Sequence, residues 1–170
     1  MAELDAYWRS SRPSRGDQRR RAGRCRLMGR RGSRAPQPPA DGMTLVLDSG
    51  GLTMLAGHRA RLEELRRRDE WPPLAASVIL TESLTGDHRR DFHENRLVRT
   101  CDVRPVDEAL ARVAAALRTA VGGARTPSAV DAIVVALADH AGGATILTTD
   151  PRDLRALARH TKNEVRVGTG

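Results

Sequence analysis

Short strand-like segments that alternate with longer helical ones are the feature of this sequence that most limits its fold. The segments TLVL at 44–47 and ATILTT at 144–149 consist almost entirely of aliphatic and β-branched residues, which is typical of buried parallel strands. Helical periodicity separates them, most clearly in EALARVAAALRTAV at 108–121, where Asp107 is placed to cap the helix. We therefore predict an α/β fold with a central, mainly parallel sheet that helices cover on both faces.

Weaker versions of both patterns occur along the rest of the chain from Met43. Aliphatic and β-branched stretches predict further strands at 74–76, 101–106 and 164–167. Apolar residues at helical spacing predict further helices at 52–57, 60–70, 78–86, 87–98, 128–141 and 151–160. Strands and helices thus alternate through residues 43–170, which we predict to form one domain.

The N-terminal residues 1–42 differ sharply from this domain in charge. They contain 11 arginines and four acidic residues, and so they carry most of the net charge of +8. Such a segment buries too little apolar surface to fold, and we predict a disordered basic extension. It is either an arm that contacts nucleic-acid phosphates or a segment outside the working protein. We favour the second interpretation, because Met43 directly precedes the first strand.

Cysteine usage and hydropathy indicate where the protein acts. Cys25 and Cys101 have no metal-binding or redox spacing, and we expect both thiols to be reduced. No apolar run approaches the length of a membrane span. We therefore expect a cytoplasmic protein without a membrane segment.

The tetrapeptide DSGG at 48–51 raises two possibilities, a serine nucleophile or a metal-binding aspartate. In chymotrypsin-like proteases the catalytic histidine precedes the serine, whereas all five histidines here follow Ser49. The Gly-x-Ser-x-Gly and Gly-x-x-x-x-Gly-Lys motifs of other hydrolases are absent from the sequence. Asp48, rather than Ser49, is therefore the candidate functional residue.

Four acidic residues stand at positions where a carboxylate needs an explanation. Asp48 and Asp150 each follow a predicted buried strand, and the carboxyl ends of parallel strands share one crevice; either residue could instead cap the next helix. Asp131 and Glu82 lie on predicted apolar helix faces, where an unpaired charge is costly. A shared cation explains all four, and oxygen ligands favour Mg²⁺ or Mn²⁺ over zinc.

Three segments of the chain carry a family resemblance. The segments LVLDSGGL, ILTESLTGD and SAVDAIVVALADHAGGATILTTDPRDLRALA resemble the successive acidic motifs of the PIN-domain family, specifically the VapC-like toxin ribonucleases of type II toxin–antitoxin systems. The resemblance covers residues 43–168. It implies a PIN-like α/β/α sandwich and a Mg²⁺-dependent endoribonuclease, with Mn²⁺ as a possible substitute.

The resemblance also implies roles for individual residues. The catalytic acids would be Asp48, Glu82, Asp131 and Asp150, with Asp48, Asp131 and Asp150 as metal ligands. Ser49, Thr148 and Asp153 would support them. One departure from the family pattern is Gly51, where relatives more often have a larger residue, and it predicts a loosely formed start of the first helix.

Interactions with other molecules are also expected from the resemblance. The substrate would be RNA, the partner a cognate antitoxin that covers the acidic groove, and the assembly a homodimer. Arg89, Arg90 and Arg125 are candidate RNA contacts, although 86–96 could equally be a solvated helix face. Two alternatives stay open: a metal-dependent nuclease outside any toxin–antitoxin system, and a non-catalytic PIN-like module that binds nucleic acid.

Overall fold

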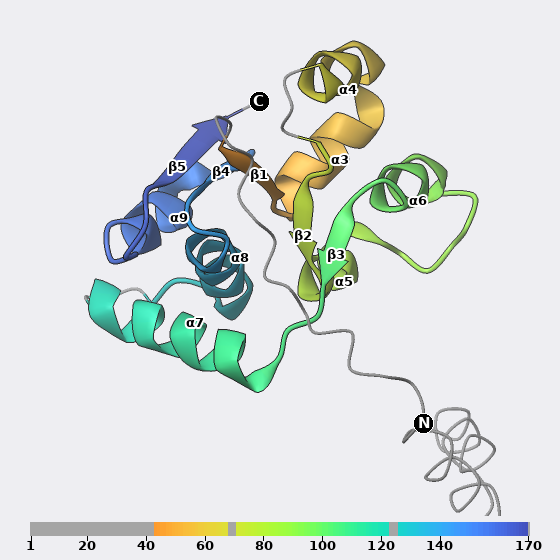
Figure 1. Cartoon of the computed structure of the whole chain (residues 1–170). Coiled ribbons are helices and arrows are strands. Elements are labelled where there is room, and N and C mark those ends of the chain that lie inside the picture. The colour runs from red at the N-terminus through yellow and green to blue at the C-terminus, as the bar shows by residue number, and fades with distance from the viewer. Residues whose placement is uncertain (1–42, 68–70, 123–125, 170) are drawn as a thin grey trace, which may run out of the picture. The chain divides into compact units, whose positions relative to one another are not determined.

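A computed structural model of the chain describes residues 43–67, 71–122 and 126–169 (Figure 1). The predictions about residues 1–42 and about Arg125 lie outside these described residues. Within the described ranges, no helix has the length and apolar character needed to cross a membrane.

Five strands form one sheet at the centre of the domain, and every pairing between neighbours is parallel. Their order is β3-β2-β1-β4-β5. Leu47, the last residue of β1, pairs with Leu147 near the end of β4, so the two strands end side by side in the middle of the sheet. The strands are β1 (Thr44–Leu47), β2 (Leu74–Ala76), β3 (Asp102–Arg104), β4 (Ala144–Thr148) and β5 (Val165–Thr169).

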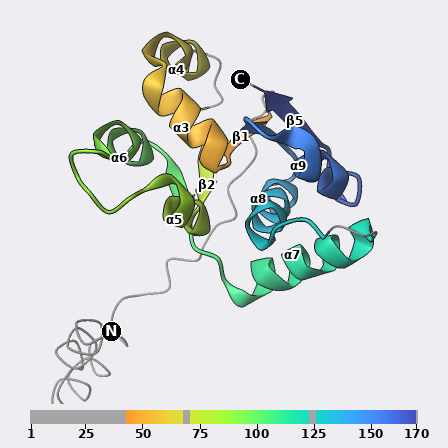
Figure 2. The same cartoon turned by 180° about the vertical axis from the view of Figure 1, so that it is seen from behind.

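Helices cover both faces of this sheet, as predicted (Figures 1 and 2). On one side α8 packs against β1, β2, β4 and β5 and is itself covered by α7 and α9, while α3 packs against β1 and β4 and contacts α4, α5 and α6. The helices are α3 (Ser49–Gly57), α4 (Arg59–Arg66), α5 (Leu80–Ser83), α6 (Phe92–Val98), α7 (Glu108–Val121), α8 (Ala129–His140) and α9 (Pro151–Ala158), with a 3₁₀ turn η1 (Ser77–Ile79) before α5.

Among the described helices α8 contributes the most residues to the core, which also includes buried residues of α3, α7 and α9. The side chains at 132 and 134–138 of α8 are all buried, which is expected for a helix that lies between a sheet and other helices. Ser128 caps this helix by accepting a hydrogen bond from the Asp131 N–H at 2.9 Å. Asp107 caps α7 in the same way, as predicted, with the Leu110 N–H as donor at 2.8 Å.

The segment between α5 and α6 differs from the prediction of two long helices. α5 ends at Ser83 and α6 begins only at Phe92. The Asp91 carboxylate accepts hydrogen bonds from the Thr85 hydroxyl at 2.8 Å and from the Gly86 N–H at 2.9 Å. Gly86 has a positive φ of 84°, which glycine adopts readily. A side chain that satisfies backbone N–H groups in this way competes with helix formation, and the helices are therefore shorter than the sequence predicts.

Candidate functional site

Asp48 is the most buried carboxylate of the candidate site. It follows β1 directly and is the N-terminal capping residue of α3, where its Oδ1 accepts a hydrogen bond from the Gly51 N–H at 2.5 Å. Only 9% of the residue is exposed. The capping role considered from the sequence is therefore present, and the carboxylate also lies at the centre of the sheet's carboxyl edge.

Thr148, the last residue of β4, connects Asp48 to the neighbouring strand. Its hydroxyl donates to Asp48 Oδ2 at 2.5 Å, and its Oγ1 accepts a hydrogen bond from the Asp150 N–H at 3.0 Å. The residue is fully buried. Each oxygen of Asp48 thus receives one hydrogen bond from the protein, and a carboxylate oxygen can accept more than one.

Burial and neighbouring acids disfavour the charged forms of two carboxyls. Burial is the main cause that raises the pKa of Asp48, with smaller contributions from the charges of Asp131 and Glu82, while the hydrogen bonds from Thr148 and Gly51 oppose it. Burial likewise raises the pKa of Asp131, helped by the charges of Asp153 and Glu82 and opposed by the hydrogen bond with Ser128. The two aspartates would therefore be stabilised by a cation.

These electrostatic interactions show which of the sequence-predicted acids the fold brings together. Asp48, Asp131 and Glu82 act on one another from the end of β1, from α8 and from α5, and Asp153 of α9 acts on Asp131. Asp150 is exposed and caps α9. Its backbone N–H connects it to Thr148, but its carboxylate accepts from the Arg152 N–H at 3.5 Å.

The carboxylate oxygens at this site are the type of ligand that Mg²⁺ or Mn²⁺ prefers, but they are not gathered into a compact set. Across residues 43–67, 71–122 and 126–169, no three His, Cys, Asp or Glu side chains form a ready-made metal-binding group. Magnesium does not require one, because proteins usually hold it through one or two carboxylates, several waters and substrate phosphates. Burial disfavours the negative charges of Asp48 and Asp131, and these are the carboxylates that a cation would stabilise.

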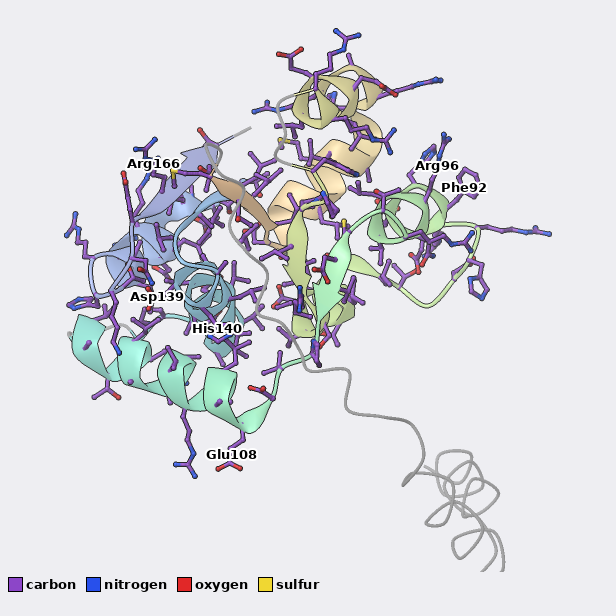
Figure 3. The ribbon with its side chains drawn as sticks, in the orientation of Figure 1. Phe92, Arg96, Glu108, Asp139, His140 and Arg166 are labelled. Atoms are coloured by element: carbon purple, nitrogen blue, oxygen red, sulfur yellow. The ribbon has the colours of Figure 1, made fainter. Side chains whose placement is uncertain are left out.

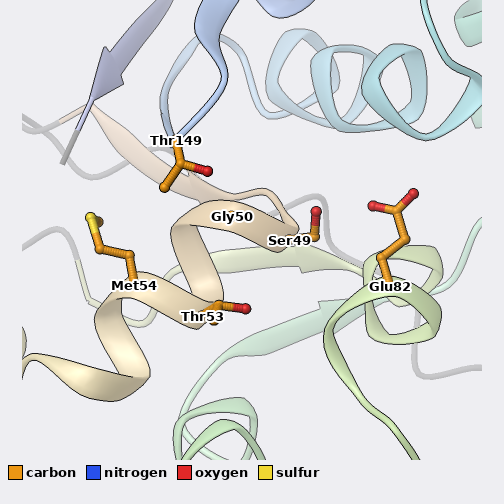
Figure 4. A pocket seen from close by; sticks show the side chains of 6 residues that line it. All are labelled: Ser49, Gly50, Thr53, Met54, Glu82 and Thr149. Atoms are coloured by element: carbon orange, nitrogen blue, oxygen red, sulfur yellow. The ribbon is translucent and has the colours of Figure 1, made fainter.

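An open groove of about 390 Å³ adjoins the acids (Figure 4). α3 supplies four of its lining residues, α5 supplies one, and the residue after β4 supplies the last. Sequence reasoning did not single out Thr53 and Met54. Both could have been found from the capping position of Asp48, because in a helix that starts at Ser49 they lie one turn beyond Ser49 and Gly50 on the same face. The lining residues are Ser49, Gly50, Thr53, Met54, Glu82 and Thr149.

The glycines that follow Ser49 let α3 pack closely against the end of β4. A Cβ atom at Gly51 would collide with the main-chain carbonyl oxygen of Leu147, and one at Gly50 would collide with the Thr149 hydroxyl. Helix α3 begins at Ser49 with a capping hydrogen bond. The prediction of a loosely formed helix start is therefore wrong, because the missing side chain allows a close backbone contact.

The candidate RNA-contacting arginines that the structure describes lie on the loop before α6. Arg89 and Arg90 are both exposed, and their N–H groups donate to Asp87 Oδ1 at 2.8 and 3.4 Å. Phe92, at the start of α6, is 58% exposed, and Figure 3 shows it together with Arg96 on the outside of that helix. Of the segment 86–96 considered as a solvated helix face, residues 88–91 form a turn and residues 92–96 belong to α6.

Comparisons with known proteins support the fold. The sequence matches no protein-family model and no curated protein. Several solved structures resemble it: DNA-bound VapBC from Salmonella typhimurium (14% identity, TM-score 0.55, covering 75% of this chain and 98% of that one), FitAcB from Neisseria gonorrhoeae (18%, 0.53, 72% and 96%) and promoter-DNA-bound VapBC2 from Rickettsia felis (12%, 0.53, 75% and 99%). At these identities the likeness is one of fold, and the PIN-like α/β/α sandwich expected from the sequence is confirmed.

Proposed function

We propose that this chain, which has the PIN-like fold found in the VapBC and FitAcB structures, is a metal-dependent endoribonuclease and the toxin of a toxin–antitoxin pair. The observation that carries the proposal is the position of Asp48. It is a buried carboxylate at the carboxyl edge of a parallel sheet, within electrostatic reach of Asp131 and Glu82 and next to an open groove. Ligand sites in open α/β sheets lie at this edge.

The residues of this site suit the hydrolysis of a phosphodiester bond. We assign a Mg²⁺ or Mn²⁺ ion to Asp48 and Asp131, with Asp150 as a third ligand and Glu82 beside them. Such an ion lowers the pKa of a bound water and offsets the charge that develops on the phosphoryl oxygens. Thr148 and Gly51 fix the orientation of Asp48 by donating one hydrogen bond to each carboxylate oxygen, and the remaining lone pairs of these oxygens would be available to hold a cation. Asp153, whose charge acts on Asp131, and Ser49, which lines the groove together with Glu82, would support these acids.

The structural neighbours also support a protein partner. VapBC and FitAcB are complexes, and we propose that this chain likewise binds a cognate antitoxin, which would cover the acidic groove. We also propose that the protein acts in the cytoplasm as a homodimer. Arg89 and Arg90 would lie beside the bound RNA.

Comparing substrates and metal conditions tests the activity. Labelled RNA and DNA of identical sequence would be incubated with the purified chain in Mg²⁺ and in EDTA. We expect RNA to be cleaved only in Mg²⁺. Cleavage of DNA alone would favour a nuclease outside a toxin–antitoxin system, and binding without cleavage would favour a non-catalytic module.

A matched pair of variants assigns the activity to this site. Glu82→Gln removes a charge that acts on both Asp48 and Asp131, whereas Glu108→Gln removes one on the exposed surface of α7, where Glu108 pairs with Arg112. We expect the first change to lower the RNA cleavage rate by orders of magnitude and the second to leave it unchanged. Equal rates for the two variants would exclude the proposed site.

A further inference from the structure

The groove beside the acids has a composition that points to a particular part of a nucleotide. Its lining combines the hydroxyls of Ser49, Thr53 and Thr149 with the Glu82 carboxylate and the Met54 thioether. We infer that it binds the ribose next to the scissile phosphate and recognises the 2′-hydroxyl, so that the protein distinguishes RNA from DNA. This inference rests on the proposed function, which it refines by assigning the choice of sugar to this groove.

The chemistry of the lining favours a sugar over a phosphate or a stacked base. Hydroxyl side chains both donate and accept hydrogen bonds, and an ionised carboxylate accepts them. A ribose 2′-hydroxyl does both, and proteins use it to distinguish RNA from DNA. In the part of the chain that the structure describes, no arginine, lysine or aromatic residue lines the groove. Phosphate sites and base-stacking platforms use such residues.

The two ends of the groove differ in polarity, and this sets the direction in which a nucleotide would lie. Figure 4 shows Glu82 and Met54 at opposite ends, with the hydroxyl side chains between them. Glu82 also acts electrostatically on Asp48, so the polar end adjoins the acids. A ribose at that end would leave its base toward Met54, whose flexible thioether adapts to flat apolar partners.

The floor of the groove is built so that its hydroxyls stay accessible. Ser49 and Thr53 lie one helical turn apart on α3, and so do Gly50 and Met54. A Cβ atom at Gly50 would occupy the space of the Thr149 hydroxyl. Glycine at this position therefore allows the hydroxyl of Thr149 to lie against the start of α3. Thr53 and Thr149 are both exposed, and each can reach a ligand.

Loss of one groove hydroxyl should weaken the recognition of RNA selectively. A neutral hydrogen bond is worth roughly a three- to tenfold change in rate or affinity. We therefore expect Thr53→Val and Thr149→Val each to lower RNA cleavage by about this factor and to leave any cleavage of the matching DNA unchanged. Thr119→Val is the matched control, because the Thr119 hydroxyl is exposed on α7 and donates to the Ala115 carbonyl at 3.1 Å.

The experiment uses one fluorescently labelled oligonucleotide sequence in three forms: RNA, DNA, and RNA with a single 2′-deoxynucleotide at successive positions. Cleavage would be followed in Mg²⁺, and binding would be followed by fluorescence anisotropy in Ca²⁺. We expect one 2′-deoxy position beside the cut to reproduce the loss caused by Thr53→Val. At that position Thr53→Val should have no further effect, whereas Thr119→Val should behave as the unchanged protein throughout.

The outcomes separate this inference from the proposed function. An RNA preference that survives the Thr53→Val, Thr149→Val double variant would overturn the assignment to the groove, and so would an unchanged protein that treats RNA and DNA alike. Preferential binding of RNA without any cleavage, lost in the double variant, would support the inference and contradict the proposed endoribonuclease activity. A chain that neither binds nor cleaves RNA would contradict both.

Discussion

Replacing Thr148 with valine removes the hydroxyl that connects β4 to Asp48 while keeping the shape of the side chain. Thr148 is fully buried and donates to Asp48 Oδ2 at 2.5 Å. A hydrogen bond to an ionised carboxylate contributes about 1.5–3 kcal/mol to the free energy of unfolding. The Asp150 N–H also loses its acceptor, but it belongs to an exposed residue and water can replace that bond. We therefore expect Thr148→Val to lower the free energy of unfolding by about 2–3 kcal/mol when Asp48 is ionised.

The loss should depend on pH, because it acts through the carboxylate. Burial already raises the pKa of Asp48, and the hydrogen bond from Thr148 opposes this effect. Without that bond the pKa of the native carboxyl rises further, while the unfolded carboxyl keeps its ordinary value of 3.8. In the variant, the pH range over which the native Asp48 carboxyl holds a proton and the unfolded one does not is therefore wider than in the parent. The stability of the variant should therefore fall more steeply than that of the parent as the pH rises.

Urea denaturation of the metal-free protein between about pH 4.5 and about pH 8 measures this difference. Thr148→Ser keeps the hydroxyl and should lose stability equally at all pH values, because only a methyl group is removed. Thr145→Val, on the same strand, is a control for the change of residue type. A Thr148→Val protein with the parent's stability and pH dependence would refute the proposed coupling between Thr148 and Asp48.

Three further changes test other parts of the account. Asp131→Asn should stabilise the metal-free protein, because burial and neighbouring acids raise the pKa of this carboxyl. The same change should lower RNA cleavage by orders of magnitude. Thermal unfolding and a cleavage assay check the two effects, and retained cleavage would argue against a role in the site. Gly51→Ala should destabilise the protein by about 1–3 kcal/mol, because the added Cβ atom collides with the Leu147 carbonyl oxygen. Gly57→Ala, where a Cβ atom meets open space, should be neutral or stabilising. Similar denaturation midpoints for the two variants would contradict this packing. The hydrogen bond from the Thr85 N–H is the main cause that lowers the pKa of Asp91. The Asp91 carboxylate therefore stabilises the fold above its ordinary pKa, and this stabilisation is lost as the pH falls through the lowered pKa. Asp91→Asn should reduce the acid sensitivity seen in urea denaturation, and an unchanged pH profile would show that the loop does not depend on this charge.

Elements whose pattern follows from local residue order were predictable from the sequence. β1 and β4 were found from runs of aliphatic and β-branched residues, and α7 from its apolar stripe and its capping Asp107. The loop at 84–91 is not predictable from local residue order, because it depends on hydrogen bonds that Thr85 and Gly86 donate to the Asp91 carboxylate. Such contacts leave no periodic pattern. The order of the strands, in which β1 lies between β2 and β4, also depends on long connections that local patterns do not specify.

In the candidate site, too, features set by local residue order were predictable, and features set by long-range contacts were not. Asp48 could be identified because it follows a strand that the sequence shows to be buried. Its hydrogen bond with Thr148 joins residues 100 positions apart, and only the parallel pairing of β1 and β4 creates it. The capping position of Asp48 places Thr53 and Met54 on the same face of α3 as Ser49 and Gly50, but the groove that they line also needs Glu82 and Thr149, which only the fold brings there.

The rate at which Asp48→Asn cleaves RNA under single-turnover conditions in Mg²⁺ is the most direct test of the proposed metal site. Asparagine keeps the size of the side chain and can still accept a hydrogen bond from the Gly51 N–H, so the protein should stay folded, as thermal unfolding would show. The substitution removes the negative charge on which the proposed metal site depends. We predict Mg²⁺-dependent cleavage by the unchanged protein and a loss of several orders of magnitude in the folded variant. Cleavage by Asp48→Asn at the rate of the unchanged protein would contradict the proposed site.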